Sequence, residues 1–173
     1  MSISRTCVTV CVVSLLASAS FAQPTQGDWE LMLGGNGSND SDFESGGGNI
    51  AGSIGHYLTD NFELGFRQDC THVDTGNDSA WNASSRVFAD LHMNLADGKV
   101  RPFVGLSVGG IYGDGVNDTG VGGPEIGIKV HLNDSTFLYG LAEYQFLFED
   151  SDDVEDNIDD GRFVYTIGLG FSW

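Results

Sequence analysis

The chain contains 173 residues, of which 25 are glycine, and its 25 acidic residues far outnumber its 7 lysines and arginines. This length fits one domain, since domains usually contain roughly 100–200 residues. The formal charge of −18 excludes a nucleic-acid-binding surface, because phosphate backbones are bound by basic patches. The mean hydropathy of −0.08 is typical of a soluble protein, although the order of the residues along the chain gives a different picture.

Residues 1–22 have the pattern of a secretory signal peptide. Arg5 is followed by an apolar run from Val8 to Ala17 and then by Ser20-Phe21-Ala22, with small residues at the positions that a signal peptidase reads. The sequence therefore predicts export, cleavage before Gln23 and one mature domain over residues 23–173. Cys70 is the single cysteine after the cleavage point, so an internal disulfide is excluded.

From Trp29 onward, large apolar residues alternate with small or polar ones, which is the period of a β-strand with two different faces. The first four predicted strands cover about 28–35, 49–58, 61–69 and 81–95. The other four cover about 99–112, 120–132, 136–148 and 162–173. The last strand is the clearest, and its large residues all share one face: Phe163, Tyr165, Ile167, Leu169, Phe171 and Trp173.

The connections between these strands alternate in length. Tight turns are expected at 59–60, 96–98 and 133–135, and longer polar connections at 36–48, 70–80, 113–119 and 149–160. Strands of about ten residues are long enough to cross a bilayer at a tilt. The sequence therefore predicts an all-β protein, an eight-stranded antiparallel up-and-down transmembrane β-barrel.

Charged residues on the strands fall on the face opposite the large apolar residues. A buried charge is costly unless it is paired and hydrogen-bonded, so a closed barrel with a paired polar interior and an apolar outer wall accounts for this pattern. Inward glycines at 105, 109, 127, 168 and 170 are expected to leave room for the long charged side chains, and a barrel of this size is too narrow for a wide pore. The predicted interior charge network consists of Glu30, Glu63, Arg67, Arg86, Asp90, Arg101, Glu125, Lys129, Glu143 and Arg162.

Outward aromatic residues gather near the strand ends and predict two girdles at the bilayer interfaces. One girdle contains Trp29, Phe62 and Trp173, and the other contains Trp81, Phe146, Phe148 and Phe163.

Three segments resemble the small outer-membrane β-barrel family that is typified by the OmpA transmembrane domain and OmpX. They are residues 55–65 (GHYLTDNFELG), residues 141–146 (LAEYQF) and the closing residues 165–173 (YTIGLGFSW). The resemblance extends over about 27–173, although its individual motifs are loose. It implies an outer-membrane barrel whose last strand is the sorting signal for the barrel-assembly machinery, here Tyr165, Ile167, Leu169, Phe171 and Trp173. The family usually ends this strand on Phe, so Trp173 is a mild departure.

The acidic connection 149–160 holds eight carboxylates, and divalent cations such as Ca²⁺ prefer oxygen ligands. The sequence leaves open a cation-bridged loop and a simply solvated one. An EF-hand is rejected at 156–161, because Ile158 occupies a ligand position. The four histidines show no metal-ligand spacing, and no catalytic residue, cofactor or enzymatic activity is expected.

The sequence leaves three functions open. The favoured one is a structural or surface-interaction barrel in the outer membrane of a Gram-negative-type cell, in contact with lipid and lipopolysaccharide, with acidic extracellular loops. The second is a narrow porin-like channel. The third is a soluble lipocalin-like ligand-binding barrel, in which the alternation would be inverted and the large apolar residues would line a cavity.

Overall fold

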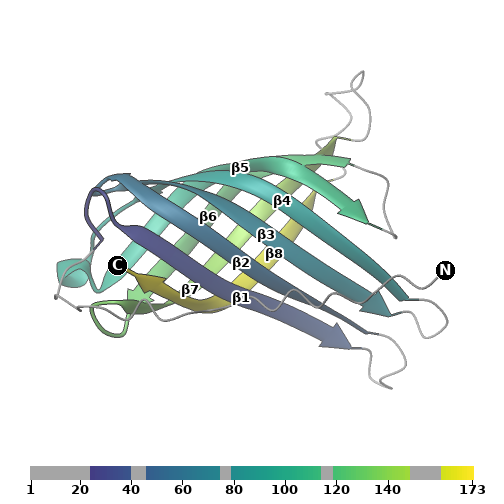
Figure 1. Ribbon diagram of the computed structural model, residues 1–173, viewed down its shortest axis with the longest axis horizontal. Helices are drawn as coiled ribbons and strands as arrows, with labels where there is room; N and C mark the ends of the chain where they lie inside the picture. Colours follow the sequence, from purple (N-terminus) through teal and green to yellow (C-terminus); the bar gives the residue numbers. More distant parts are fainter. Residues whose placement is uncertain (1–23, 40–45, 75–78, 114–118, 149–160) are drawn as a thin grey trace, which may run out of the picture.

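The structure is a computed structural model that describes residues 24–39, 46–74, 79–113, 119–148 and 161–173. Its eight antiparallel strands pair in chain order, and the last pairs with the first to close a barrel (Figure 1). The predicted all-β, eight-stranded up-and-down barrel is confirmed. The strands are β1 (Trp29–Asn39), β2 (Gly46–Thr59), β3 (Phe62–Asp74), β4 (Ser79–His92), β5 (Val100–Gly113), β6 (Thr119–His131), β7 (Thr136–Phe148) and β8 (Arg162–Ser172).

Several strands are longer at one end than the sequence predicts. β1 continues to Asn39, and β2 begins at Gly46, because residues 36–39 pair with 46–49 in an unbroken ladder. β3 likewise continues to Asp74, paired with β2 and β4. Glycine and asparagine are poor strand formers on average, but backbone hydrogen bonds to a neighbouring strand override that local preference. The expected signal peptide and the acidic connection 149–160 lie outside the described residues.

β4 ends earlier than predicted, at His92 instead of residue 95. The chain then passes through a short 3-10 turn, Ala96–Gly98, where both Ala96 and Gly98 have positive φ angles. Glycine adopts such a conformation without strain, which is what the tight reversal into β5 requires.

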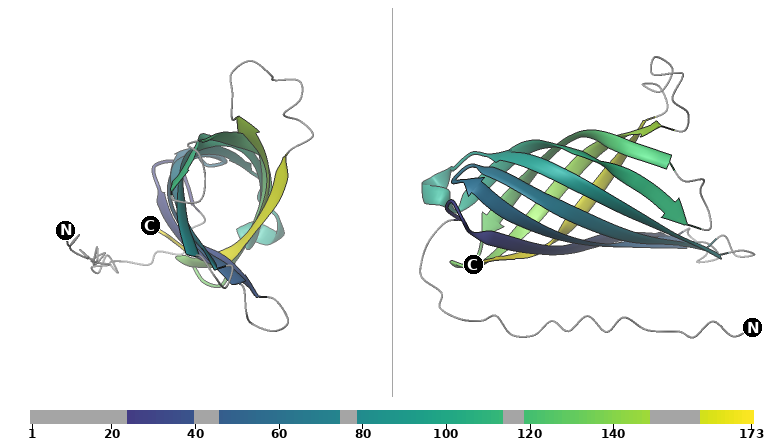
Figure 2. Two further views of the ribbon diagram at one scale, coloured as in Figure 1. Left: turned by 90° about the vertical axis from the view of Figure 1, so that its right-hand side faces the viewer. Right: turned by 45° about the horizontal axis from the view of Figure 1, so that its top comes forward.

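The start of β1 and the residue that follows β8 are joined at the end of the barrel that carries the short turns. The Trp29 amide donates to the Trp173 carbonyl at 2.9 Å, and the Trp173 amide donates back to the Trp29 carbonyl at 3.0 Å. Figure 2 shows the closed ring of strands in a view along the barrel and, in its other view, the C-terminus beside the short turns. We call this end the turn side, and the opposite end, where the long connections leave the wall, the loop side.

The two faces of the wall have opposite chemistry. Of the described residues, 28 large apolar side chains are exposed, and all but Met93, Leu95, Leu132 and Trp173 belong to the strands. The inside holds charged groups and one apolar cluster, formed by Met32, Phe88, Phe103, Phe137, Tyr139 and Leu141. Among the described residues, no helix is both long and apolar enough to cross a membrane.

The inward glycines make room for two kinds of side chain, charged groups and aromatic rings, whereas the sequence predicted charged groups alone. Gly105 and Gly109 make room for Asp90 and Arg86, as expected. Gly127, Gly168 and Gly170 instead lie against the rings of Phe103, Tyr139 and Phe137. The rings reach across from a neighbouring strand and fill the space that the missing side chains leave.

Candidate functional site

The candidate site is the charged interior of the barrel. Nine of the ten residues in the predicted network are buried, with exposed fractions of 5% or less. The tenth, Arg162, is exposed, because it is the first residue of β8 and lies at the loop-side mouth. Its Nε donates to Gln145 at 2.9 Å, and Gln145 donates in turn to Glu143, so one amide joins Arg162 to the interior.

Residues of like charge stand directly opposite each other on neighbouring strands. β3 and β4 pair Arg67 with Arg86, and they pair Glu63 with Asp90. β6 pairs Glu125 with Glu143 of β7. Lys129 of β6 faces Arg101 of β5 in the same way. Like charges in such positions destabilise a sheet, so each pair depends on opposite charges that reach it across the lumen.

The loop-side cluster, which consists of Arg67, Asp69, Arg86, Glu125 and Glu143, meets this requirement fully. Arg67 forms a two-pronged ion pair with Glu125, with N–O distances of 2.9 and 3.1 Å. Arg86 bonds both Glu143 and Asp69, and Ser107 and Gln145 donate to Glu143 as well. The planar guanidinium matches carboxylates in this forked geometry.

The turn-side cluster, which consists of Glu30, Glu63, Asp90, His92, Arg101 and Lys129, is organised around one ammonium group. Lys129 bonds Glu30 and also lies 2.8 Å from Glu63. Its nitrogen lies 5.4–5.6 Å from the ring centroids of Tyr57, Phe103 and Phe137, within the range of cation–π attraction. The compact Lys129 ammonium thus pairs with two carboxylates and lies close to three aromatic rings.

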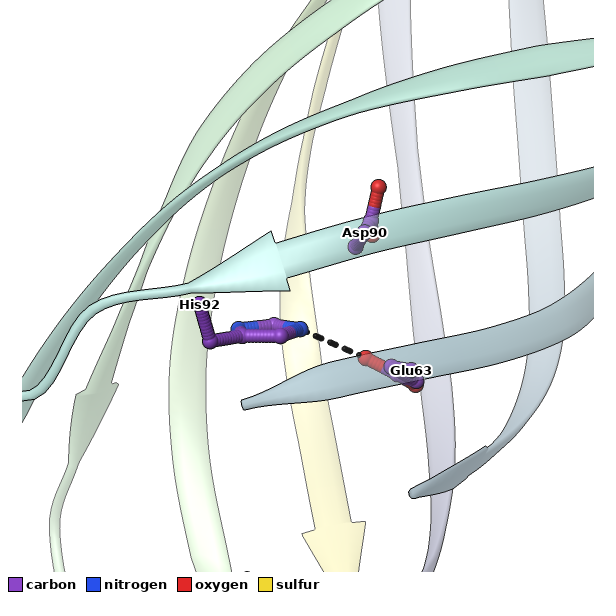
Figure 3. Close-up of side chains that lie close together, drawn as sticks. All are labelled: Glu63, Asp90 and His92. Carbon is purple, nitrogen blue, oxygen red and sulfur yellow. Dashed lines mark hydrogen bonds and ion pairs between the residues drawn. The ribbon is translucent and has the colours of Figure 1, made fainter. Parts of the chain in front are cut away.

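Two charged groups of this cluster have no ion-pair partner among the described residues. Arg101 donates from Nη2 to the Asp60 carbonyl at 2.7 Å, while its Nε and Nη1 are buried without a hydrogen bond. Asp90 is 1% exposed, and both of its carboxylate oxygens lack a hydrogen-bond partner. Figure 3 shows Asp90 beside the hydrogen-bonded pair Glu63 and His92.

Sequence reasoning missed part of this interior. Asp69 continues the inward series Glu63, Gly65, Arg67 by the period of two, so the pattern itself could have found it. His92 follows Asp90 in the same way on β4. Tyr57 and the ring cluster carried no such signal, because an aromatic residue fits either face of a strand.

The outer wall presents the residues of the predicted assembly signal. Tyr165, Ile167, Leu169, Phe171 and Trp173 are all exposed on β8 and just beyond it. Trp29 and Trp173 lie at the turn side, and Trp81, Phe148 and Phe163 are exposed near the loop side. Exposed aromatic side chains therefore stand at both ends of the wall, although Phe62 and Phe146 of the predicted girdles are half-buried and Phe66 is exposed between the two ends.

These features define a closed eight-stranded barrel of the outer-membrane type, with an apolar exterior and a charged, filled interior. The N-terminal β-barrel domain of Pseudomonas aeruginosa OprF is similar to this chain, with a TM-score of 0.60 at 20% identity, over 87% of this chain and 100% of that one. The outer membrane protein OprG from the same organism gives a TM-score of 0.59 at 11% identity, over 86% and 97% of the two chains. A designed transmembrane β-barrel gives 0.52 at 12% identity, over 87% and 98%. The sequence matches no family model and no curated protein.

Proposed function

We propose that the protein is an integral outer-membrane β-barrel with a structural or surface-interaction role. The observation that carries this proposal is the inverted distribution of its side chains: large apolar residues cover the outside, and the charged residues of the strands are buried. Contact between this apolar outer wall and water would be unfavourable, whereas contact with the hydrocarbon core of a bilayer is favourable. The similarity in fold to OprF and OprG supports the same placement.

The soluble lipocalin-like alternative requires the opposite arrangement. Phe163, Tyr165 and Ile167 would have to line a cavity, yet each is more than 60% exposed on the outside of β8. Arg67 and Lys129 would have to face water, and both are buried. The structure therefore gives no support to a soluble ligand-binding barrel.

The orientation and partners follow from the asymmetry of the two ends. We assign the turn side to the periplasm and the loop side, with the acidic connection 149–160, to the cell exterior. There the wall contacts lipid and lipopolysaccharide, and the acidic loops are the surface open to divalent cations. The outward residues of β8, from Tyr165 to Trp173, are the element that the barrel-assembly machinery recognises.

Membrane fractionation combined with electrophoresis tests this function. We expect the exported chain to fractionate with outer membranes and to migrate faster in SDS when unboiled than when boiled, because a closed barrel resists SDS until it is heated. A chain that is soluble without detergent and migrates identically before and after boiling contradicts the proposal.

The filled interior argues against a narrow channel as the principal function. Ion pairs and aromatic rings occupy the lumen at successive inward positions of the strands. We expect planar-bilayer recordings to show no conductance above leak, and steady single-channel steps would favour the porin-like alternative.

A further inference from the structure

The buried charges inside the barrel do not balance. Among the described residues, six carboxylates are buried: Glu30, Glu63, Asp69, Asp90, Glu125 and Glu143. Four cations are buried with them: Arg67, Arg86, Arg101 and Lys129. With every group ionised, the enclosed interior would carry two more negative charges than positive ones. Uncompensated charge in a medium of low polarity is strongly unfavourable, so the excess has to be neutralised by protons or by a bound cation.

Asp90 marks the place where that charge is needed. It stands directly opposite Glu63 across β3 and β4, and both side chains point into the lumen. Lys129 is bonded to Glu63 and Glu30, and Asp90 forms no direct ion pair with any cation in the described part of the chain. Glu63 also keeps one buried oxygen, Oε1, without a hydrogen-bond partner.

His92 completes a set of metal-ligand atoms around this point. Its Nε2 lies 2.9 Å from Glu63 Oε2, and one ligand atom from each of Glu63, Asp90 and His92 lies within 4.8 Å of the others. Ligand atoms about 2.0–2.1 Å from a tetrahedral zinc ion lie roughly 3.4 Å apart. The histidine and the glutamate are already near that spacing, and the Asp90 oxygen, within 4.8 Å of both, has to move inward to reach it. Figure 3 shows His92 and Glu63 pointing toward one another, with Asp90 on the strand beside Glu63.

From this geometry we propose that Glu63, Asp90 and His92 bind one divalent metal ion inside the barrel. One imidazole nitrogen and two carboxylate oxygens form a ligand set that suits Zn²⁺ and related transition metals better than Ca²⁺, which takes oxygen ligands alone. The two charges of the ion match the two unbalanced carboxylates. Lys129 stays in place as a partner of Glu63 and Glu30 and orients the glutamate ligand.

Because the site is enclosed, the ion enters while the chain folds, and this sets the form of the experiment. The chain is unfolded in urea with EDTA, desalted, and refolded into lipid vesicles with Zn²⁺ present. EDTA then strips metal from exposed groups, including the acidic connections, and metal content is measured by atomic emission on protein whose folding is verified by heat-modifiable mobility. We expect the wild-type chain to retain one zinc ion.

Variants assign the retained ion to its ligands. We expect Asp90→Asn and His92→Gln to retain none, because each removes a ligand. His56→Gln is the matched control and should retain one, since His56 lies on the outer wall against Trp29, with ring centroids 4.5 Å apart. A folded wild-type chain without zinc overturns the proposal and leaves protons as the balancing charge. Equal zinc in wild type and Asp90→Asn overturns it as well.

A spectroscopic readout keeps the test independent of how well the variants fold. The wild-type chain is refolded with Co²⁺ in place of Zn²⁺, treated with EDTA in the same way, and its visible absorption is recorded. Bands of nitrogen- and oxygen-coordinated Co²⁺ that persist after EDTA are expected. A featureless spectrum from folded protein contradicts the site.

Discussion

The two charge clusters inside the barrel are built on the same plan and differ in how completely it is carried out. In each cluster, two like charges on neighbouring strands face two opposite charges across the lumen. On the loop side, Arg67 and Arg86 satisfy their carboxylates through forked contacts. On the turn side, Lys129 takes two carboxylates while Arg101 turns to a carbonyl and Asp90 stays unpaired.

The comparison separates two properties: ion pairing that stabilises the barrel and the ability to bind a further cation. A cluster in which every carboxylate is ion-paired links opposite walls of the barrel and leaves no carboxylate without a cation. The turn-side cluster has one ammonium at its centre and an unpaired carboxylate beside it. Its stability depends heavily on that ammonium, and the unpaired carboxylate can bind a second cation. The four predictions below perturb one cluster or the other, from the largest expected effect to the smallest.

Lys129→Met should have the largest effect. It leaves Glu30 and Glu63 buried without their shared cation, and breaking a buried pair in this way costs about 3–5 kcal/mol per stranded charge. We expect the variant to lose at least about 5 kcal/mol in urea unfolding from lipid vesicles, followed by tryptophan fluorescence. Adding Glu30→Gln and Glu63→Gln should recover most of this loss, and a Lys129→Met variant as stable as wild type would show that the ammonium is not central.

Arg67→Met should cost less, about 3 kcal/mol in the same measurement. It strands Glu125, but Arg86 continues to neutralise Glu143 and Asp69. The double variant Arg67→Met, Glu125→Leu should return to near wild-type stability, because a packed apolar pair replaces a buried ion pair at little cost. If the double variant is as unstable as the single one, packing and not charge determines the effect.

Gly127→Ala should cost about 1–3 kcal/mol, because a Cβ at this position meets the ring of Phe103. That ring packs beneath Lys129, so the substitution disturbs the turn-side cluster through its aromatic support. Gly140→Ala is the matched control, since a Cβ there has nothing within 4 Å. Equal unfolding midpoints for the two variants would contradict the close fit between ring and glycine.

Tyr57→Phe should have the smallest effect, about 0.5–1.5 kcal/mol, through loss of the hydrogen bond from Lys129 to the phenol oxygen at 3.3 Å. Its effect should add to that of Arg67→Met, because Tyr57 contacts the turn-side cluster and Arg67 belongs to the loop-side cluster. It should not add to that of Lys129→Met, which already removes the donor. Non-additivity with Arg67→Met would mean that the clusters act as one unit.

The architecture could be predicted from the sequence because alternation with a period of two leaves little freedom. Once Phe163, Tyr165 and Ile167 share a face, the opposite face is set, and the alternation of short and long connections determines which strands are neighbours. The same period placed nine charged residues inside. It also implied Asp69, which is the last residue of the predicted third strand although β3 continues to Asp74. It placed His92 on the inward face of the fourth strand as well, but a histidine was not counted in the predicted charge network.

The pairing inside the lumen could not be predicted in this way. Period two assigns a face but gives no distance across the barrel, so it does not distinguish a Lys129 that reaches Glu30 from one that reaches Asp90. Nor does it separate glycines that accommodate a charge from those that accommodate a ring. These depend on the stagger of the strands around the closed barrel, a property of the whole ring and of no single segment.

The backbone hydrogen bonds between Trp29 and Trp173 bear on the order in which the barrel assembles. Strands β1 and β8 are the first and last of the barrel, so the wall has two open edges until β8 is in place. The ion pair between Lys129 and Glu30 likewise joins β6 to β1 and can form only when the sheet has curled round. Contacts so distant along the chain form late in folding. We therefore expect the charges of the lumen to stay in contact with water until the barrel closes, with dehydration of the interior among the last steps of assembly.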